Sequence, residues 1–257
     1  MKIIAVVSAK GGVGKTTVTA NLSTALRREG RNVLTVDLDP QNALHLHFGG
    51  DPQRIAGTSR ATLAGEDWRD VGFVSPTGVV VMPYGAVNED DRRAFENRLE
   101  SRPRWLADNL RALDLGPDDI VVVDTPPGPS IYMRTALSAA NLALIVTLPD
   151  AASYATLPMM EGLVQTYCIP RPDFIDHAFV INQVDNSRLL ARDVSQIMRA
   201  DFGERIVGII HQDQSVCEAL AFNQSVLDYD PRCQATQDYL ACARSVAAAL
   251  SAFGPAS

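Results

Sequence analysis

The chain has 257 residues, of which 46% are hydrophobic and 21% are charged, and its formal net charge is −7. This composition is that of an ordinary globular protein, and a chain of this length buries enough surface to fold without disulfides or structural metals. The negative net charge excludes a general attraction to nucleic acid or anionic lipid, although it leaves room for a local basic patch.

Segments that direct a protein to a membrane are not evident in the sequence. The chain has no apolar stretch of about 18 residues, and the apolar run 3–7 is too short for a signal peptide. The four cysteines form no CxxC pair, which is typical of thiols in a reducing compartment. His45 and His47 are two residues apart, but no carboxylate or cysteine cluster supports a metal site there. These features predict a cytoplasmic protein.

Short apolar strands alternate with longer amphipathic helices along the chain. Most of the expected strands are continuous apolar runs, as is typical of strands covered on both faces. They span residues 3–7, 32–36, 78–82, 120–123, 142–148, 178–181 and 206–210. The expected helices span residues 16–28, 104–113, 189–201, 215–221 and 234–253. This alternation predicts a three-layer α/β fold with a mostly parallel sheet of about seven or eight strands.

The region 49–102 is richer in glycine, proline and charge, and we expect loops and short helices there. Its exposed faces are a plausible docking surface, because binding residues tend to lie on loops carried by a rigid scaffold. The chain contains no internal repeat and nothing that resembles an interdomain linker. We therefore expect residues 1–257 to form a single domain.

A glycine-rich segment, KGGVGKTT at residues 10–17, follows the first expected strand and leads into the first expected helix. Glycines allow backbone N–H groups to approach phosphate oxygens closely, and the helix N-terminus adds a favourable dipole. Lys15 is expected to reach the β- and γ-phosphates, and Thr16 to offer its hydroxyl to Mg²⁺. The predicted ATP-binding residues are Gly11, Gly12, Val13, Gly14, Lys15, Thr16 and Thr17.

This segment departs from the ordinary GxxxxGK[ST] pattern, since Ala9 replaces the first glycine and Lys10 adds a second lysine. By itself, Lys10 fits an ordinary solvated side chain. The complete string, however, resembles the deviant Walker-A motif of the MinD/ParA-like ATPases. The resemblance implies that Lys10 acts in catalysis across an ATP-dependent homodimer interface, where a cation offsets charge on the transferring phosphoryl group.

Two further strands end in acidic residues, at the edge where a doubly wound sheet holds its ligand. Residues 33–41 (VLTVDLDPQ) resemble switch I of this family, which implies that Asp39 orients the attacking water and that Asp37 lies in the outer shell of Mg²⁺. Residues 120–128 (IVVVDTPPG) resemble a Walker-B strand and switch II, so that Asp124 is the predicted metal carboxylate. Each aspartate has a structural alternative, the capping of a nearby turn.

Two later segments resemble the parts of this family that lie near the base. Residues 178–185 (AFVINQVD) imply that Asn182 contacts adenine, and residues 209–216 (IIHQDQSV) imply that Asp213 lies at the edge of the nucleotide. His211 and Gln212 occur where Ile and Pro are common. The resemblance therefore leaves the path of this loop open.

The regions outside these motifs bear on the choice of partner. Residues 240–253 carry one cation, which makes them a poor membrane anchor and predicts no direct membrane insertion. The cations after residue 173 are scattered arginines, so that DNA binding is not favoured but remains open. Residues 65–70, 81–85 and 211–226 resemble the BcsQ group, which is associated with bacterial cellulose synthase, and residues 42–49 (NALHLHFG) also fit it.

The BcsQ resemblance implies a Mg-ATP-dependent, slowly hydrolysing homodimer that supports the assembly or positioning of a cellulose secretion complex. Protein components of that complex would recruit it to the inner membrane or the cell pole. Two alternatives stay open. One is a ParA-type partition or positioning ATPase that binds non-specific DNA, and the other is a nucleotide-bound scaffold that does not hydrolyse ATP. The combination of Lys10, Lys15, Thr16, Asp39 and Asp124 argues against the scaffold.

Overall fold

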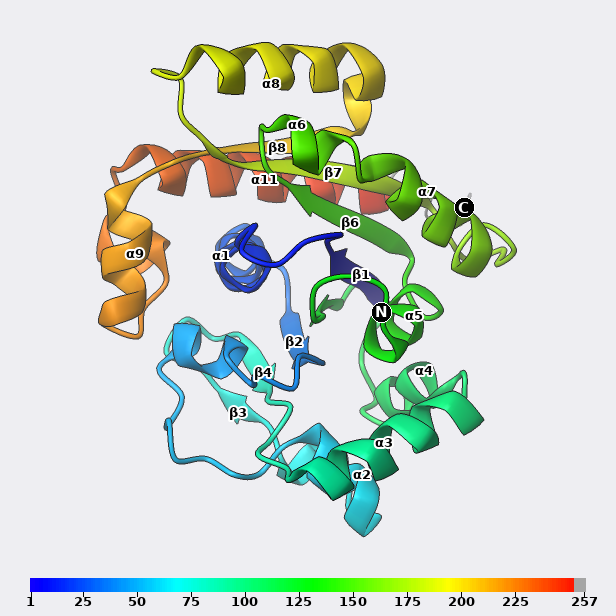
Figure 1. Cartoon of the computed structure of the whole chain (residues 1–257). Coiled ribbons are helices and arrows are strands. Elements are labelled where there is room, and N and C mark those ends of the chain that lie inside the picture. The colour runs from blue at the N-terminus through cyan, green and yellow to red at the C-terminus, as the bar shows by residue number, and fades with distance from the viewer. Residues whose placement is uncertain (252–257) are drawn as a thin grey trace.

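Residues 1–251 are described by the structure, which is a computed structural model of the chain. Within them, one eight-stranded sheet runs through the molecule in the order β3-β4-β2-β5-β1-β6-β7-β8 (Figure 1). All neighbouring pairs are parallel except β3 and β4. The strands are β1 (Lys2–Val7), β2 (Val33–Asp37), β3 (Phe73–Val74), β4 (Val80–Met82), β5 (Ile120–Asp124), β6 (Leu142–Thr147), β7 (Asp176–Val184) and β8 (Ile206–His211).

The central strands supply side chains to two hydrophobic cores, one on each face of the sheet. Along β1, Ile3, Ala5 and Val7 pack into one core, whereas Ile4 and Val6 pack into the other. Both sets of side chains are almost completely buried. A strand covered on both faces has few positions for a polar residue, which explains the nearly continuous apolar runs in the sequence.

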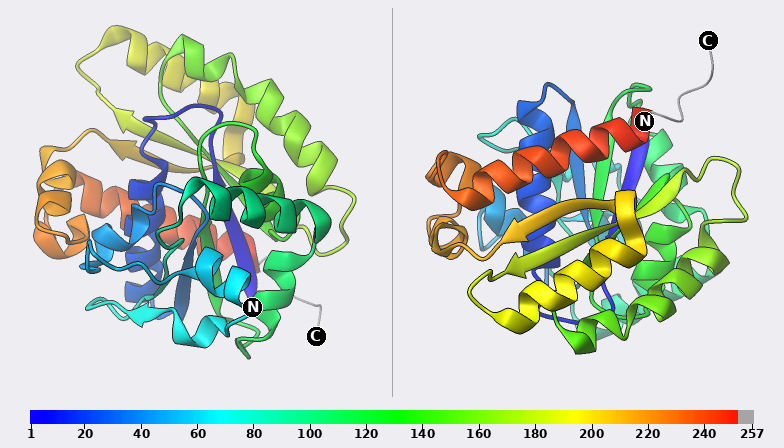
Figure 2. Two further views of the ribbon diagram at one scale, coloured as in Figure 1. Left: turned by 60° about the horizontal axis from the view of Figure 1, so that its bottom comes forward. Right: turned by 90° about the horizontal axis from the view of Figure 1, so that it is seen from above.

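Helices cover both faces and complete the predicted three-layer fold. One face carries α2 (Thr58–Ala64), α3 (Glu89–Ser101), α4 (Trp105–Arg111), α5 (Ile131–Leu137), α6 (Ala151–Tyr154), α7 (Leu157–Tyr167) and α8 (Leu189–Phe202). The other carries α1 (Lys15–Arg28), α9 (Gln214–Ala221), α10 (Val226–Tyr229) and α11 (Gln234–Ser251). Figure 2 shows α11 and α8 on opposite sides of β7 and β8. In the part of the chain described, no helix has the length and apolarity that a membrane span requires.

The seven expected strands and five expected helices all appear with small shifts at their ends, although residues 252–253 of the last expected helix lie outside the described residues. The expectation for residues 49–102 was wrong in part. This region contains the 13-residue helix α3 and the antiparallel edge strand β3. Helix α3 is highly charged and buries only Phe95 and Leu99, so its apolar periodicity is weak.

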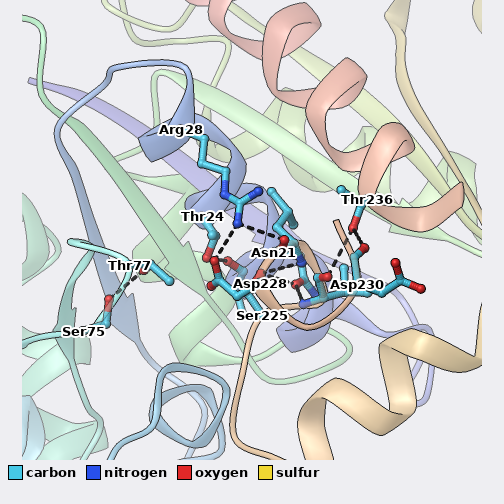
Figure 3. Close-up of polar contacts among 12 residues, drawn as sticks. Asn21, Thr24, Arg28, Ser75, Thr77, Ser225, Asp228, Asp230 and Thr236 are labelled. Carbon is cyan, nitrogen blue, oxygen red and sulfur yellow. Dashed lines mark hydrogen bonds and ion pairs between the residues drawn. The ribbon is translucent and has the colours of Figure 1, made fainter. Parts of the chain in front are cut away.

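Helix α1 is anchored at some distance from its N-terminus to the segment that precedes α11 (Figure 3). The side-chain oxygen of Asn21 accepts hydrogen bonds from the hydroxyl of Ser225 (2.8 Å) and the N–H of Val226 (2.9 Å). Nearer the C-terminus of α1, Arg28 donates to the Leu227 carbonyl (2.8 Å) and pairs with Asp228. These contacts fix the helix that carries Lys15 and Thr16.

Candidate nucleotide-binding site

The loop between β1 and α1 lies at the carboxyl edge of the sheet, where the strand order reverses around β1. Gly12 and Gly14 adopt left-handed backbone conformations, with φ of 76° and 82°. Gly14 is the N-cap residue of α1, and no side chain of the described residues caps this helix end. The first backbone N–H groups of α1 are therefore available to an anion, as a polyphosphate site requires.

Strand β7 and the segment that follows β5 hold the loop in shape. The amide nitrogen of Asn182, at the end of β7, donates to the Val13 carbonyl at 2.8 Å. The N–H of Gly128, which follows β5, donates to the Ser8 carbonyl at 2.9 Å. A Cβ atom on Gly14 would lie 2.4 Å from the Asn182 amide nitrogen. Position 14 therefore requires glycine both for its φ angle and for space.

A β-bulge brings Asn182 to the loop. The pairing of β7 with β8 shifts register between Ile181 and Val184, and Gln183 has a φ of 56°, which is uncommon for a residue other than glycine. Asn182 is 5% exposed, whereas the Gln183 side chain is exposed. The sequence implied that Asn182 contacts the base. The structure shows its amide nitrogen bound to the phosphate loop, and contact of Asn182 with the base stays a prediction.

Asp124 ends β5 directly beneath the phosphate loop. One of its oxygens accepts a hydrogen bond from the Thr16 hydroxyl at 2.6 Å, and the other accepts one from Thr19 at 3.2 Å. Burial raises the pKa of Asp124 to about 6, and the charge of Asp39 acts in the same direction, whereas Lys15 and the two threonines lower it. Thr19 was not among the predicted site residues. Thr19 could have been found from the sequence, because it lies one helical turn after Lys15 and therefore on the same face of α1.

Asp37 ends the neighbouring strand β2 and is the register partner of Asp124. It is fully buried, and its two oxygens accept the backbone N–H groups of Asp39 (2.8 Å) and Leu44 (3.1 Å). Burial, followed by the charge of Asp124, raises the pKa of Asp37 well above its ordinary value. The alternative role, turn capping, is therefore observed for Asp37, and its role near a metal stays a prediction.

Of the remaining predicted catalytic residues, Asp39 and Lys15 lie near this carboxylate pair, and Lys10 lies at the front of the phosphate loop. Asp39 is 8% exposed, and one of its oxygens accepts the N–H of Gln41 at 2.9 Å. Lys15 is 6% exposed and is close enough to Asp124 to lower the pKa of that carboxyl group. Lys10 is half-buried and forms no ion pair with any residue in the range 1–251. Its ammonium group therefore remains available for a ligand or a second copy of the chain.

A cavity of about 200 Å³ adjoins the phosphate loop. Gly14 and Thr17 line it from the loop, Asn182 from β7, and Asp213 and Val216 from the start of α9. Its position suits the nucleoside half of a nucleotide whose phosphates lie on the loop.

Asp213 lies in the wall of this cavity, as its prediction as a nucleotide-edge residue requires, but its oxygens are used by the protein. One oxygen accepts the N–H of Ser215 at 3.0 Å and caps α9. The other accepts the N–H of Ala235 near the start of α11 at 3.2 Å. The observed role of Asp213 is therefore to join two helix N-termini, and direct contact with the nucleotide stays a prediction.

The fold and the phosphate loop define a P-loop nucleotide-binding protein of the MinD/ParA type. The model of the family described as "Cellulose biosynthesis protein BcsQ" matches residues 1–246. The chain therefore belongs to the BcsQ family, as the sequence patterns predicted.

Individual relatives confirm the same class. The chain is similar to the chromosome partitioning protein ParA of Caulobacter vibrioides, with 30% identity over 257 residues that covers 96% of this chain and 94% of the relative. It is also similar to the cellulose biosynthesis protein BcsQ of Escherichia coli K12, with 27% identity that covers 95% of this chain and 93% of the relative. Among solved structures, the MinD protein of Pyrococcus horikoshii complexed with Mg-ADP has a TM-score of 0.76 and 27% identity, with 95% of each chain covered.

Proposed function

We propose that this protein is a Mg-ATP-dependent switch that dimerises when it holds ATP and separates after slow hydrolysis. The observation that carries the proposal is the contact between Thr16 and Asp124, which places a hydroxyl and a carboxylate together beneath a loop with free N–H groups. A hydroxyl and a carboxylate are the oxygen ligands that Mg²⁺ takes in nucleotide sites.

ATP and Mg²⁺ are the ligands that this site takes. The left-handed glycines and the uncapped N-terminus of α1 form a cradle for phosphate oxygens. Thr16 and Asp124 are the residues that would hold the metal, which when bound supplies positive charge to the phosphate oxygens. Lys15 adds a buried cation close to Asp124.

The protein's own groups account for the remaining steps. Asp39 keeps one carboxylate oxygen for the turn at Gln41 and has the other available to orient a water molecule. Lys10 extends from the front of the loop, and in a face-to-face dimer it would lie against the nucleotide of the second copy. The dimer is therefore required for full activity.

The partner of this switch is, in our proposal, a cellulose synthase or secretion complex. The family match and the similarity to BcsQ of Escherichia coli support it. The protein would act in the cytoplasm, and protein contacts would recruit it to the inner membrane or the cell pole. The similarity to a ParA protein supports a second candidate function, a partition or positioning ATPase that binds non-specific DNA.

The variant Asp39→Asn tests the switch, because an asparagine oxygen still accepts the N–H of Gln41 and preserves the local turn. We expect ATP affinity within about threefold of the wild type and a turnover number lower by about a hundredfold. ATP-dependent dimerisation, measured by light scattering, should persist in Asp39→Asn and be lost in Lys10→Ala. Wild-type turnover in Asp39→Asn would remove Asp39 from the mechanism, and a wild-type protein without turnover would favour the scaffold.

Duplex DNA of unrelated sequence separates the two candidate partners. The trapped Asp39→Asn dimer is mixed with the duplex in ATP, in ADP and without nucleotide, over a series of salt concentrations. Binding that needs ATP and weakens steeply with salt would establish the partition-type function. An ATP-dependent dimer that leaves the DNA unbound would support recruitment by protein partners.

A further inference from the structure

His211 ends β8 and lies in the wall of the cavity beside the phosphate loop. Its ring nitrogen Nδ1 lies 2.9 Å from a carboxylate oxygen of Asp238, on α11. The same oxygen accepts the backbone N–H of His211 at 2.8 Å, and the other oxygen accepts the amide N–H of Gln234 at 2.8 Å. The Asp238 side chain is only 9% exposed, so the carboxylate is held in one orientation.

This contact determines which ring nitrogen carries the proton. A neutral imidazole has one N–H donor and one acceptor nitrogen, and an ionised carboxylate can only accept. Nδ1 therefore carries the hydrogen and donates it to Asp238, while Nε2 keeps its lone pair. Within residues 1–251, Nε2 has no hydrogen-bond partner, and the side chain is 29% exposed. Nε2 is thus a fixed acceptor without a protein donor.

The sequence singled out Asn182 and Asp213 for the nucleoside, and the protein already engages the amide nitrogen of the first and both carboxylate oxygens of the second. The Asn182 amide nitrogen donates to Val13, and the Asp213 oxygens accept backbone N–H groups of α9 and α11. His211 thus brings to the same cavity a ring acceptor that the protein leaves unused.

We propose that His211, positioned by Asp238, selects the nucleotide by accepting a hydrogen bond from a donor group of the nucleoside. The primary candidate for that donor is the exocyclic amino group of adenine, and a ribose hydroxyl has the same chemistry. Guanine and hypoxanthine have a carbonyl where adenine has the amino group, and a carbonyl cannot donate to Nε2. The inference rests on the proposed ATP site and names the group that distinguishes among nucleotides there.

Affinities of a set of nucleotides test this proposal. Dissociation constants are measured for ATP, ITP, 2′-deoxy-ATP and 3′-deoxy-ATP with the wild type, His211→Phe and Asp238→Ala. Gln212→Ala is the matched control, since Gln212 lines the same cavity and its backbone contact with Val184 does not depend on the side chain. We expect His211→Phe to bind ATP about three- to tenfold more weakly, with ITP affinity unchanged. Asp238→Ala should change the ATP/ITP ratio in the same direction by a smaller factor, and Gln212→Ala should not change it.

The pattern among analogues identifies the donor. If His211→Phe weakens ATP and ITP alike but leaves one deoxy analogue unaffected, the proposal stands with the ribose hydroxyl as the donor. An equal loss of affinity for all four nucleotides, or no loss for any, overturns the proposal. A His211 that only connected β8 to α11 would not distinguish among nucleotides. A wild-type protein that binds none of them contradicts the proposed ATP site itself, which separates the two failures.

Nuclear magnetic resonance of the wild type gives a second test that needs no variant to fold. Long-range ¹H–¹⁵N spectra at mildly alkaline pH distinguish the two tautomers of a histidine ring. We expect His211 to carry its hydrogen on Nδ1, and its Nε2 resonance to shift on addition of ATP. An equal shift with ITP indicates the ribose hydroxyl as the donor, and a shift with ATP alone indicates the adenine amino group. A hydrogen on Nε2, or a doubly protonated ring, would contradict the proposal.

Discussion

Asp37 and Asp124 are register partners at the ends of neighbouring parallel strands, and both are fully buried. Their surroundings differ. Asp124 accepts hydrogen bonds from Thr16 and Thr19 and lies near Lys15, whereas Asp37 accepts two backbone N–H groups of its own turn. The difference assigns the two carboxylates separate tasks, one toward the phosphate loop and one in the turn that contains Asp39.

Substitution of each aspartate by asparagine separates these tasks. Asp124→Asn removes a buried charge, so we expect unchanged or greater stability at neutral pH and loss of the Mg²⁺ dependence of nucleotide affinity. Asp37→Asn leaves one of two backbone N–H groups without an acceptor and should cost about 1–3 kcal/mol of unfolding free energy. Chemical denaturation and nucleotide titration with and without EDTA check both. Loss of the Mg²⁺ effect in Asp37→Asn would instead establish the metal role that the sequence implied.

Gly14→Ala tests the close contact between the phosphate loop and Asn182. The added Cβ clashes with the amide nitrogen of Asn182, and the backbone at φ 82° disfavours alanine. We expect nucleotide affinity to fall by at least about tenfold and the unfolding free energy to fall by more than about 2 kcal/mol.

Gly30→Ala is the control for this prediction, because Gly30 has a φ of 84° and its Cβ position is open. It should lose about 1 kcal/mol through backbone strain alone, with normal nucleotide binding. Equal effects in the two variants would show that the contact with Asn182 does not matter.

His47 predicts an acid-sensitive component of stability. It lies in the short 3₁₀ helix Leu44–Phe48 after switch I, is 6% exposed, and its burial lowers its pKa from 6.5 to about 4. Because the folded-state pKa is below the unfolded-state pKa, this stabilisation is complete above pH 6.5 and is lost as the pH falls toward about 4.

The variant His47→Leu isolates that component, since Asp37 and Asp124 titrate alike in both proteins. We expect the difference in unfolding free energy, variant minus wild type, to rise by about 3 kcal/mol between neutral and acid pH. Denaturant titrations at several pH values measure it. A difference that stays constant with pH would show that His47 is protonated with similar ease in the folded and unfolded chains.

The anchor of α1 predicts a contrast between a buried amide and an exposed ion pair. Asn21 is 2% exposed and serves two donors, so Asn21→Ala should cost about 2–4 kcal/mol and weaken nucleotide binding through misplacement of α1. Arg28→Ala removes a pair whose side chains are 38% and 39% exposed, and we expect a loss below about 1.5 kcal/mol. Thermal unfolding and nucleotide affinity of the two variants are compared directly. A larger loss in Arg28→Ala would reverse this assignment.

The parallel sheet was predictable because strands buried on both faces leave a continuous apolar signature. β3 was missed because two residues are too few to show a pattern, and because its partner β4 lies at the irregular edge of the sheet. Helix α3 was missed because its buried side is narrow. In both cases tertiary packing, rather than local periodicity, determines the element.

The residues of the site likewise divide into those that local sequence patterns reveal and those that tertiary packing determines. The residues of the phosphate loop and the carboxylates at two strand ends could be found from sequence patterns, since parallel strands bring their ends to one edge. The hydrogen bond from Asn182 to Val13 could not, because it depends on a bulge at Gln183 that no spacing reveals. The Asp238 partner of His211 lies 27 residues away on another element and was likewise invisible.

The hydrogen bonds from Asn182 and Gly128 to the phosphate loop come from β7 and from the segment after β5, which lie on either side of β1, and they involve protein atoms alone. The phosphate loop is therefore preorganised by the protein and does not need to close around its ligand. The loop loses little conformational entropy when phosphate binds, and it keeps its conformation after phosphate leaves. Nucleotide exchange in the monomer should consequently be fast, and in the proposed dimer the lifetime of each cycle should be set by the separation of the two subunits.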